Sequence, residues 1–506
     1  MKLIKTLFNL MFHRVFVVAI MLLLQVALFV AGVMFLGNLA VYIYAFFEVV
    51  SLMVVIGIVS KDEKSDYKMT WIFAIMAFPL VGGIFYLIFA NKYVSKQIRD
   101  EMDATEREMA HYLPSTAPIP NNADALLLSQ YIYNITGFPA YAGTTSTYFP
   151  LGEGMYQQML HQLENAKNYI LMEYFIVHPG KMWDGIFEIL CRKVQEGVKV
   201  YFMYDDVGSI NTMPVEWILR IRNAGIHQCI FNPLRPRMNV LLNNRDHRKI
   251  LVVDGETAFC GGINLADEYI NQYERFGHWK DTGVMLQGDA AWPFVLMFLQ
   301  LWRSASRQTL AIDDFRPKAC SRKGDGLVQG FGDSPLDQFN VSEVCYLNAI
   351  TRAKKYVYIT TPYLVIDYAM EQSLCSAASA GVDVRVITPM QYDKWYVHML
   401  TQSHYEKLVR AGVKIYEYTP GFMHGKMFVA DDEVCMVGTC NMDFRSFHLH
   451  FECSALFYGG QIVQDVKQDI LDCQKICQQI RLEDVQNPPF HIKVMRALLK
   501  ILAPLM

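Results

Sequence analysis

A short polar pattern occurs twice in this chain of 506 residues, with the same residue types at the same spacing. In each copy a His is followed by a Lys two positions later, by an Asp seven positions later and, after a Gly-containing segment, by an Asn. The two copies comprise His247, Lys249, Asp254 and Asn264, and His424, Lys426, Asp431 and Asn441. A match of this length at identical spacing indicates that one functional motif is duplicated in the chain. We therefore expect two similar halves, each of which contributes one His and one Lys to a common centre.

Each motif adjoins a short apolar run that predicts a buried strand. Residues 250–253 and 427–430 are entirely apolar, and an Asp closes each run, as expected for strands that end in a turn. Residues i and i+2 of a strand share a face. The His and the Lys of each motif are therefore expected to point the same way.

An imidazole beside an ammonium group suits chemistry on a phosphodiester. The Lys neutralises a non-bridging oxygen, while the His attacks phosphorus or protonates the leaving oxygen. Asn264 and Asn441 follow a Gly-containing turn and are placed to donate further hydrogen bonds to the same oxygens. The competing interpretation, histidines satisfied within a packed core, suits one isolated copy better than two matched copies. The motifs together predict a symmetric phosphate-handling centre.

The duplicated motif resembles the HKD signature of the phospholipase D superfamily. The segments around it narrow the resemblance: residues 416–423 precede the second motif and residues 441–446 follow it, while 278–282 and 360–363 lie elsewhere. Together they resemble bacterial cardiolipin synthases of the phospholipase D type over essentially the whole chain. One position departs from that pattern, because His450 stands before Phe451-Glu452 where the family has Asn.

Three further short segments recur in the two halves. The pairs are 166–170 with 353–357, 197–200 with 381–384, and 223–226 with 410–413. Each half is therefore predicted to run strand, helix, strand, helix and then the strand beside the motif, which is an α/β unit. The resemblance implies that two such phospholipase D-like sandwich repeats pack around a pseudo-two-fold axis, with the active site between them.

The apolar residues are concentrated at the N-terminus. Residues 15–59 contain one charged side chain, Glu48, and are long enough for two membrane spans with a break near residues 37–38. A third apolar run, 69–90, is interrupted by Pro79. The total length excludes a simple cleaved signal peptide. We expect a multi-pass protein of the cell membrane.

The orientation of the catalytic region is less constrained. Three full spans place it outside if the N-terminus is cytoplasmic, whereas a re-entrant third segment keeps it cytoplasmic. Three basic residues accompany each candidate flank, so the positive-inside rule does not decide. The eleven cysteines show no disulfide-like spacing, which favours a reducing compartment and a cytoplasmic catalytic region.

The expected organisation has five parts. The parts are a membrane region (1–90), a connector (91–122), repeat 1 (123–318), repeat 2 (319–485) and an amphipathic C-terminal helix (486–506). In the last part, Lys and Arg alternate with apolar residues at near-helical spacing, which is typical of a helix at a lipid interface. An ordinary docked terminal helix is the alternative.

The predicted catalytic set consists of the two motifs. By resemblance, His247 attacks phosphorus to form a phosphohistidine, and His424 protonates the departing alcohol and then deprotonates the incoming one; the symmetry of the motifs permits the reverse assignment. The groups expected to bind phosphate are Lys249, Lys426, Asn264 and Asn441. The expected acceptors that orient the histidines are Asp281 and Glu452. Asp254 and Asp431 belong to the motifs, but we expect them to fix turn geometry rather than to contact substrate.

Other features of the sequence argue against metal-dependent, nucleotide-dependent and nucleic-acid-binding functions. No carboxylate cluster of the two-metal kind and no nucleotide-binding glycine loop accompany the motifs, so we expect no metal and no cofactor. The net charge of −3 and the apolar N-terminus disfavour a nucleic-acid substrate. The resemblance implies phosphatidyl transfer between two phosphatidylglycerols to give cardiolipin and glycerol, with membrane lipid as partner and no obligatory protein partner. The alternative is a membrane-anchored phospholipase D that hydrolyses headgroups or transfers phosphatidyl to another alcohol.

Overall fold

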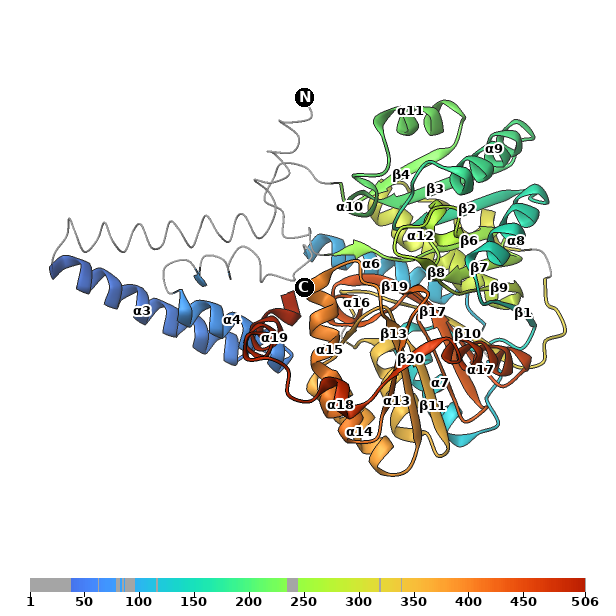
Figure 1. Cartoon of the computed structure of the whole chain (residues 1–506). Helices are drawn as coiled ribbons and strands as arrows, with labels where there is room; N and C mark the ends of the chain where they lie inside the picture. Colours follow the sequence, from blue (N-terminus) through green and yellow to red (C-terminus); the bar gives the residue numbers. More distant parts are fainter. Residues whose placement is uncertain are drawn as a thin grey trace. The chain divides into compact units, whose positions relative to one another are not determined.

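The chain forms two compact units in a computed structural model that describes residues 38–61, 63–78, 82–83, 86, 96–114, 117–233, 244–317, 320–337 and 339–505. The smaller unit contains residues 1–93, 237–240 and 497–506, and the larger unit contains residues 94–236 and 241–496. Figure 1 shows both units with the helices and strands labelled.

The smaller unit contains one helix, among the described residues, that is long and apolar enough to cross a membrane. Helix α3 (Asn38–Val59) begins where we expected a break between spans, and its apolar stretch, residues 41–59, is only 11% buried. The neighbouring helix α4 (Ser65–Ala77) is shorter than a span and packs on α3. The hydroxyl of Thr70 in α4 donates to the carbonyl of Ile501 at 2.6 Å. The first predicted span, residues 15–36, and Pro79 lie outside the described residues.

The larger unit contains two main sheets. The first has the strand order β1-β9-β7-β6-β2-β3-β4, in which β2, β3 and β4 are parallel and the other pairs are antiparallel. Its strands are β1 (Thr144–Phe149), β2 (Tyr169–Tyr174), β3 (Lys199–Asp205), β4 (His227–Phe231), β6 (Ile250–Val253), β7 (Thr257–Gly261) and β9 (Gly283–Gly288).

The second sheet follows the same plan. Its order is β10-β19-β17-β16-β11-β13-β14-β20, so each strand of the first sheet has a counterpart in the same place and β20 is an addition. Its strands are β10 (Leu327–Asp333), β11 (Tyr356–Thr360), β13 (Asp383–Pro389), β14 (Lys414–Tyr418), β16 (Met427–Ala430), β17 (Val434–Gly438), β19 (His450–Tyr458) and β20 (Cys477–Ile480). The recurring segments of the sequence thus correspond to equivalent strands.

Helices connect the strands of both halves, and two further helices follow the last strand. Those of the first half are α8 (Gly152–Glu164), α9 (Lys181–Gln195), α10 (Asp206–Ser209), α11 (Val215–Asn223) and α12 (Trp292–Ser306). Those that follow are α13 (Val341–Arg352), α14 (Tyr368–Ser379), α15 (Trp395–Arg410), α16 (Phe444–His448), α17 (Gln461–Gln474), α18 (Leu482–Val485) and α19 (Phe490–Leu502). In α9, for example, the apolar residues recur at helical spacing and are buried on one face, while Asp184, Glu188 and Arg192 are exposed.

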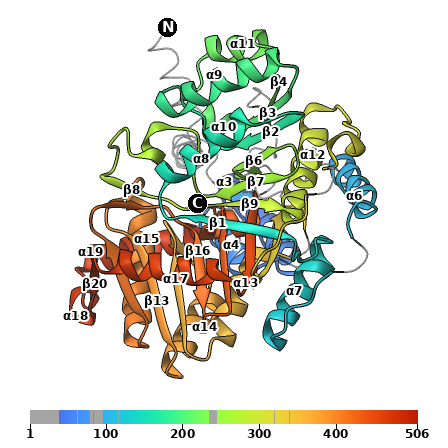
Figure 2. The ribbon, with the colours of Figure 1, turned by 90° about the vertical axis from the view of Figure 1, so that its right-hand side faces the viewer.

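A continuous apolar core joins the two halves. One cluster of buried side chains includes Leu171 and Val252 of the first sheet together with Val429 and Val437 of the second. Figure 2 shows the green and yellow elements of the first half above the orange elements of the second. The joint between the halves is therefore a packed interface rather than a loose contact between domains.

Two helices precede the first sheet. They are α6 (Lys96–Ala110) and α7 (Ala123–Thr136). We assigned residues 123–136 to the first repeat, but Leu128 and Ile132 of α7 are buried with Phe331 and Tyr346 of the second half. Helix α7 therefore belongs to the core of the second half, although it comes before the first sheet in the chain.

Five very short strands complete the larger unit and pair between segments far apart in sequence. Strand β5 (Arg245–Asp246) pairs in parallel with β19, and β15 (Gly421–Met423) pairs in parallel with β8 (His278–Lys280). A further parallel pair joins β12 (Leu364–Val365) to β18 (Met442–Asp443). In the first two pairs a strand of one half lies beside a strand of the other.

The motif aspartates hold the starts of the central strands. The carboxylate of Asp254 accepts hydrogen bonds from the backbone N–H groups of residues 167–169 at 2.7–2.9 Å, where β2 begins. Asp431 accepts from the N–H groups of residues 354–356 at 2.6–2.9 Å, where β11 begins. Both aspartates have positive φ, 52° and 53°, a conformation that Asp and Asn tolerate better than most residues.

These contacts predict that substitutions of Asp431 lower the stability of the protein, by an amount that depends on how many acceptor oxygens are lost. D431N keeps the tolerance for positive φ and one acceptor oxygen, and it should destabilise the protein by about 1–2 kcal/mol. D431A removes all acceptors and adds backbone strain of about 1 kcal/mol or more. The melting temperature in detergent should fall from wild type to D431N to D431A.

The exposed Asp472, which contacts only other surface side chains, provides the control. D472A should melt close to the wild-type temperature. An unchanged melting temperature for D431A would contradict a structural role for this aspartate.

Candidate active site

The two motif histidines lie at the ends of the strands that pair between the halves. The backbone N–H of His247, directly after β5, donates to the carbonyl of Phe451 in β19 at 2.9 Å. The N–H of His424, directly after β15, donates to the carbonyl of Lys280 in β8 at 2.7 Å. Each histidine is thus positioned by the backbone of the opposite half, which brings both motifs to the joint.

The histidine side chains are held across the same joint. Nδ1 of His247 lies 2.8 and 2.9 Å from the two carboxylate oxygens of Glu452, and Nδ1 of His424 lies 2.5 Å from Oδ2 of Asp281. Both carboxylates are completely buried. The structure therefore brings both expected acceptors to the histidines, each paired with the motif of the other half. A proton on each Nδ1 leaves Nε2 free for chemistry.

The motif lysines are buried beside the histidines. Nζ of Lys249 donates to the carbonyl of His247, and Nζ of Lys426 donates to the carbonyl of His424, both at 2.5 Å. Burial lowers the pKa of Lys249 to about 8 and that of Lys426 to about 7, although Glu452 and Asp281, respectively, oppose the shift. These ammonium groups are therefore poorly solvated, and a phosphate anion is a natural partner for them.

The four groups act on one another electrostatically. Burial lowers the pKa of His247 well below its usual range, and the charges of Lys249 and Lys426 lower it further. Burial also lowers the pKa of His424 to about 4, assisted by Lys426 and opposed by Asp281. Both imidazoles are consequently neutral at neutral pH before an anion binds. An entering phosphodiester offsets the lysine charges and raises the pKa of both histidines.

The two motif asparagines are not equivalent. Nδ2 of Asn264 donates to the hydroxyl of Tyr269 at 2.8 Å, and its Oδ1 accepts from the N–H of Ile176 at 3.0 Å. The amide of Asn264 therefore holds the ring of Tyr269, which lies 5.6 Å from that of His424. Oδ1 of the buried Asn441 has no hydrogen-bond partner within the part of the chain that the structure describes.

Asp281 and Glu452 each contact the residue that follows the first glycine of a motif, which is Gly262 in one motif and Thr439 in the other. At Gly262 an added Cβ would lie 2.1 Å from Oδ1 of Asp281, so only glycine allows this approach. At the equivalent position the hydroxyl of Thr439 donates to Glu452 at 2.5 Å. We did not identify Thr439 from the sequence. The Gly-to-Thr difference between otherwise matched motifs was the available signal.

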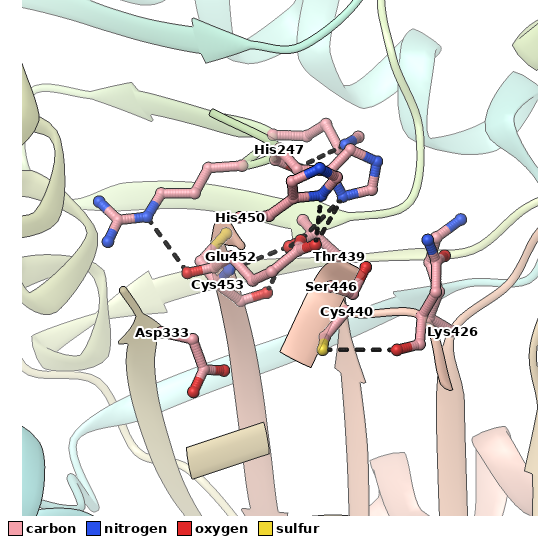
Figure 3. Close-up of polar contacts among 12 residues, drawn as sticks. His247, Asp333, Lys426, Thr439, Cys440, Ser446, His450, Glu452 and Cys453 are labelled. Atoms are coloured by element: carbon pink, nitrogen blue, oxygen red, sulfur yellow. Dashed lines mark hydrogen bonds and ion pairs between the residues drawn. The ribbon is translucent and has the colours of Figure 1, made fainter. Parts of the chain in front are cut away.

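Aromatic rings pack against both histidines, and two of these rings occupy equivalent positions in the two halves. The ring of Trp279 lies 5.2 Å from that of His424, and the ring of His450 lies 5.2 Å from that of His247. Both residues stand two positions before the carboxylate of their own half. Figure 3 shows the imidazoles of His247 and His450 together above Glu452.

Comparisons with known proteins agree with this arrangement. Residues 346–473 match the family described as "Cardiolipin synthase, PLD-like domain", and residues 40–91 match "Phospholipase_D-nuclease N-terminal".

Several relatives align over most of the chain. An uncharacterized protein of Streptococcus mutans is 39% identical over 89% of this chain and 99% of its own length. The cardiolipin synthases of Geobacillus kaustophilus and Halalkalibacterium halodurans are 32% and 33% identical over 88% and 91% of this chain, and over 90% and 94% of their own lengths.

Among solved structures, the phosphatidylserine synthase of Haemophilus influenzae superimposes with a TM-score of 0.58 at 15% identity. The alignment covers 75% of this chain and 97% of that one, which shows a common phospholipase D-like fold. Together with the curated relatives, which confirm the resemblance seen in the sequence, these matches show that the chain belongs to the cardiolipin synthase family of phospholipase D-like proteins.

Proposed function

We propose that this protein is a cardiolipin synthase that transfers a phosphatidyl group from one phosphatidylglycerol to the glycerol headgroup of another. The observation that carries the proposal is the crossed arrangement of the site. Two buried His–Lys pairs from opposite halves act on one another electrostatically, and each His is oriented by a carboxylate of the other half. This arrangement offers a nucleophile, a general acid and two cations to a single phosphodiester.

The reaction takes two displacements. Nε2 of His247 attacks phosphorus, the bond from phosphorus to the glycerol oxygen breaks, and His424 delivers a proton to that oxygen. The hydroxyl of the second phosphatidylglycerol then attacks the phosphohistidine and gives its proton to His424, and the P–N bond breaks. The products are cardiolipin and glycerol, with no net change in the enzyme.

The environments of the histidines favour this assignment over the reverse. Burial and the charges of both lysines act together to lower the pKa of His247, which keeps its ring neutral. For His424, the pKa of about 4 includes an opposing contribution from Asp281, which favours the protonated ring when the substrate anion arrives. A neutral nucleophile at His247 and an acid at His424 follow.

The two halves act as repeats related by a pseudo-two-fold axis. The support is the equivalent strand order of the two sheets and the pair of cross-joint ladders, β5 with β19 and β15 with β8. In this arrangement Lys249 and Lys426 bind the phosphoryl oxygens from two sides. Asn441 adds a hydrogen-bond donor, whereas Asn264 acts through Tyr269.

Lipid reaches the site from the membrane surface. The segment 390–396, which follows β13 and includes the first two residues of α15, exposes Met390, Tyr392 and Trp395, side chains suited to the headgroup region of a bilayer. Lys394 in the same segment contributes to the lowered pKa of His247, so this segment lies close enough to the site for its charge to act there. Lipid held by the segment is therefore near the catalytic groups.

The protein is anchored by several membrane segments with its catalytic region in the cytoplasm. Helix α3 supplies one span. Helix α19 exposes Phe490, Val494 and Leu498 and carries Lys493 on the same short helix, as expected at an anionic lipid interface. All eleven cysteines are free thiols, which suits a reducing compartment.

The proposal is tested by lipid analysis of cells that lack a cardiolipin synthase of their own. Expression of the wild-type chain should produce cardiolipin, whereas H247A and H424A should each reduce the yield at least about 100-fold. Equal membrane levels of the three proteins must be shown by immunoblotting.

The identity of the lipid product separates the alternatives. Phosphatidic acid in place of cardiolipin would show a hydrolase. A new phosphatidyl ester of another alcohol would show a different transferase, and cardiolipin made by H247A would exclude this site.

A phosphodiester lipid with a p-nitrophenol leaving group distinguishes the roles of the histidines. This leaving group departs without protonation, so H424A should release about one equivalent of p-nitrophenol per chain in a burst, while H247A should release none. The purified proteins are compared in detergent by stopped-flow absorbance. A burst from H247A and none from H424A would reverse the assignment.

The lowered pKa of Lys426 predicts the alkaline side of the pH profile. As the pH rises through about 7, Lys426 of the free enzyme loses its proton and one positive charge that attracts the phosphodiester. The value of kcat/KM should therefore fall above about pH 7. At low pH, protonation of His247 removes the nucleophile, and the full profile should be bell-shaped.

K426R provides the matched comparison, because a guanidinium group stays protonated throughout this range. Its alkaline limb should move to higher pH relative to its own maximum. A wild-type rate that is flat from pH 6 to 9, or an alkaline limb unchanged in K426R, would contradict the role given to Lys426.

A further inference from the structure

His450 is a buried histidine that the transfer mechanism does not use. It is only 7% exposed, and its Nδ1 has no hydrogen-bond partner among the described residues. That nitrogen lies 3.4 Å from Oε1 of Glu452, on the same carboxylate that accepts from Nδ1 of His247. One donor atom from each of the three side chains lies within 4.8 Å of the others (Figure 3).

The other half of the molecule shows what this position requires for packing alone. Trp279 occupies the equivalent place and holds its ring 5.2 Å from that of His424, the distance that separates His450 from His247. A ring is therefore sufficient to support the catalytic histidine. The imidazole of His450 adds a metal-binding nitrogen that Trp279 lacks, and only one of the two half-sites carries it.

We propose that His247, His450 and Glu452 form a binding site for Zn²⁺ or a similar divalent transition metal, and that the bound metal inhibits the enzyme. Two imidazoles and one carboxylate are a characteristic zinc ligand set, with the fourth position open to water or phosphate. Tetrahedral zinc with bonds of about 2.0–2.1 Å separates its ligand atoms by about 3.4 Å. The observed separations from Oε1 of Glu452 to Nδ1 of His247 and of His450, 2.9 and 3.4 Å, are close to this value.

Inhibition follows from the nitrogen that the metal occupies. In the active enzyme, Nδ1 of His247 carries the proton and Nε2 carries the lone pair that attacks phosphorus. A metal at Nδ1 takes the lone pair there, so the ring proton moves to Nε2 through solvent and the nucleophilic lone pair is lost. The metal also engages Glu452, which otherwise orients the ring.

The positive charge of the site weakens its affinity for a dication. We therefore expect the metal to act as a reversible inhibitor rather than as a permanently bound cofactor. The ammonium group of Lys249 lies in the same buried site and opposes a dication, while only one of the three ligands is anionic. The expectation that catalysis needs no metal is compatible with this proposal. The metal site stands on its own geometry, and its inhibitory effect rests on the proposed function.

Metal binding is measured directly on the full-length protein in detergent. Titration with Co²⁺ should produce a visible ligand-field spectrum of one ion per chain, which Zn²⁺ displaces. H450F keeps a ring against His247 but removes a ligand, and it should weaken binding at least about tenfold, as should E452Q. H161A, which removes an exposed histidine, should bind as the wild type does. Equal Co²⁺ affinity in wild type and H450F would overturn the site.

Activity is then measured with phosphatidylglycerol vesicles, with each variant compared to its own metal-free rate. Zn²⁺ at concentrations that fill the wild-type site should abolish cardiolipin formation, EDTA should restore it, and H450F should resist inhibition at least about tenfold. Metal bound at the site without inhibition would overturn the regulatory role. Metal bound by a chain that makes no cardiolipin under any condition would refute the proposed function and leave the site intact.

Discussion

The hydrogen bonds from Nδ1 of His247 to Glu452 and from Nδ1 of His424 to Asp281 are the interactions on which the site depends. Each spans the joint between the halves, so neither half can orient its own histidine. Leaving one buried carboxylate without its partner costs roughly 3–5 kcal/mol, which couples docking of the halves to formation of the site. A separated half would retain a His–Lys pair with no fixed tautomer.

The two motifs lie in equivalent strands but have different surroundings. Arg248 donates to the backbone carbonyl of Glu452 at 3.2 Å and lies beside the buried Glu173 and Asp246, whereas Gly425 stands at the position of Arg248 in the second motif. Burial raises the pKa of Asp246 to about 7, and Arg248 packs against this buried carboxyl group, a contact that Gly425 cannot make in the second motif. Unequal surroundings of this kind are how two identical histidines acquire different roles in one reaction.

The sequence predicted the parts that depend on local pattern. Apolar runs closed by Asp correctly predicted β6 and β16, and the equal spacing of the motifs identified the two His–Lys pairs that folding brings to the joint. The crosswise pairing was not predictable, because β5 and β8 are two and three residues long and carry no periodic signal. The sequence likewise predicted that the amide of Asn264 binds phosphate, but in the folded chain this amide donates to the hydroxyl of Tyr269. Helix α7 joined the second core for the same reason: its partners are distant in sequence.

Because the two motif lysines are buried, their charges make the pKa of the histidines sensitive to the binding of an anion. Lys249 and Lys426 are each only 1% exposed, and without an anion their charges keep both histidines neutral. In the mechanism that we propose, a phosphodiester that enters between them supplies the missing negative charge, strengthens the hold of both ammonium groups and raises the pKa of His424 toward the range where it can act as an acid. Activation therefore follows from binding of the phosphodiester itself, and the acceptor that takes the phosphoryl group is then decided by which hydroxyl the membrane delivers.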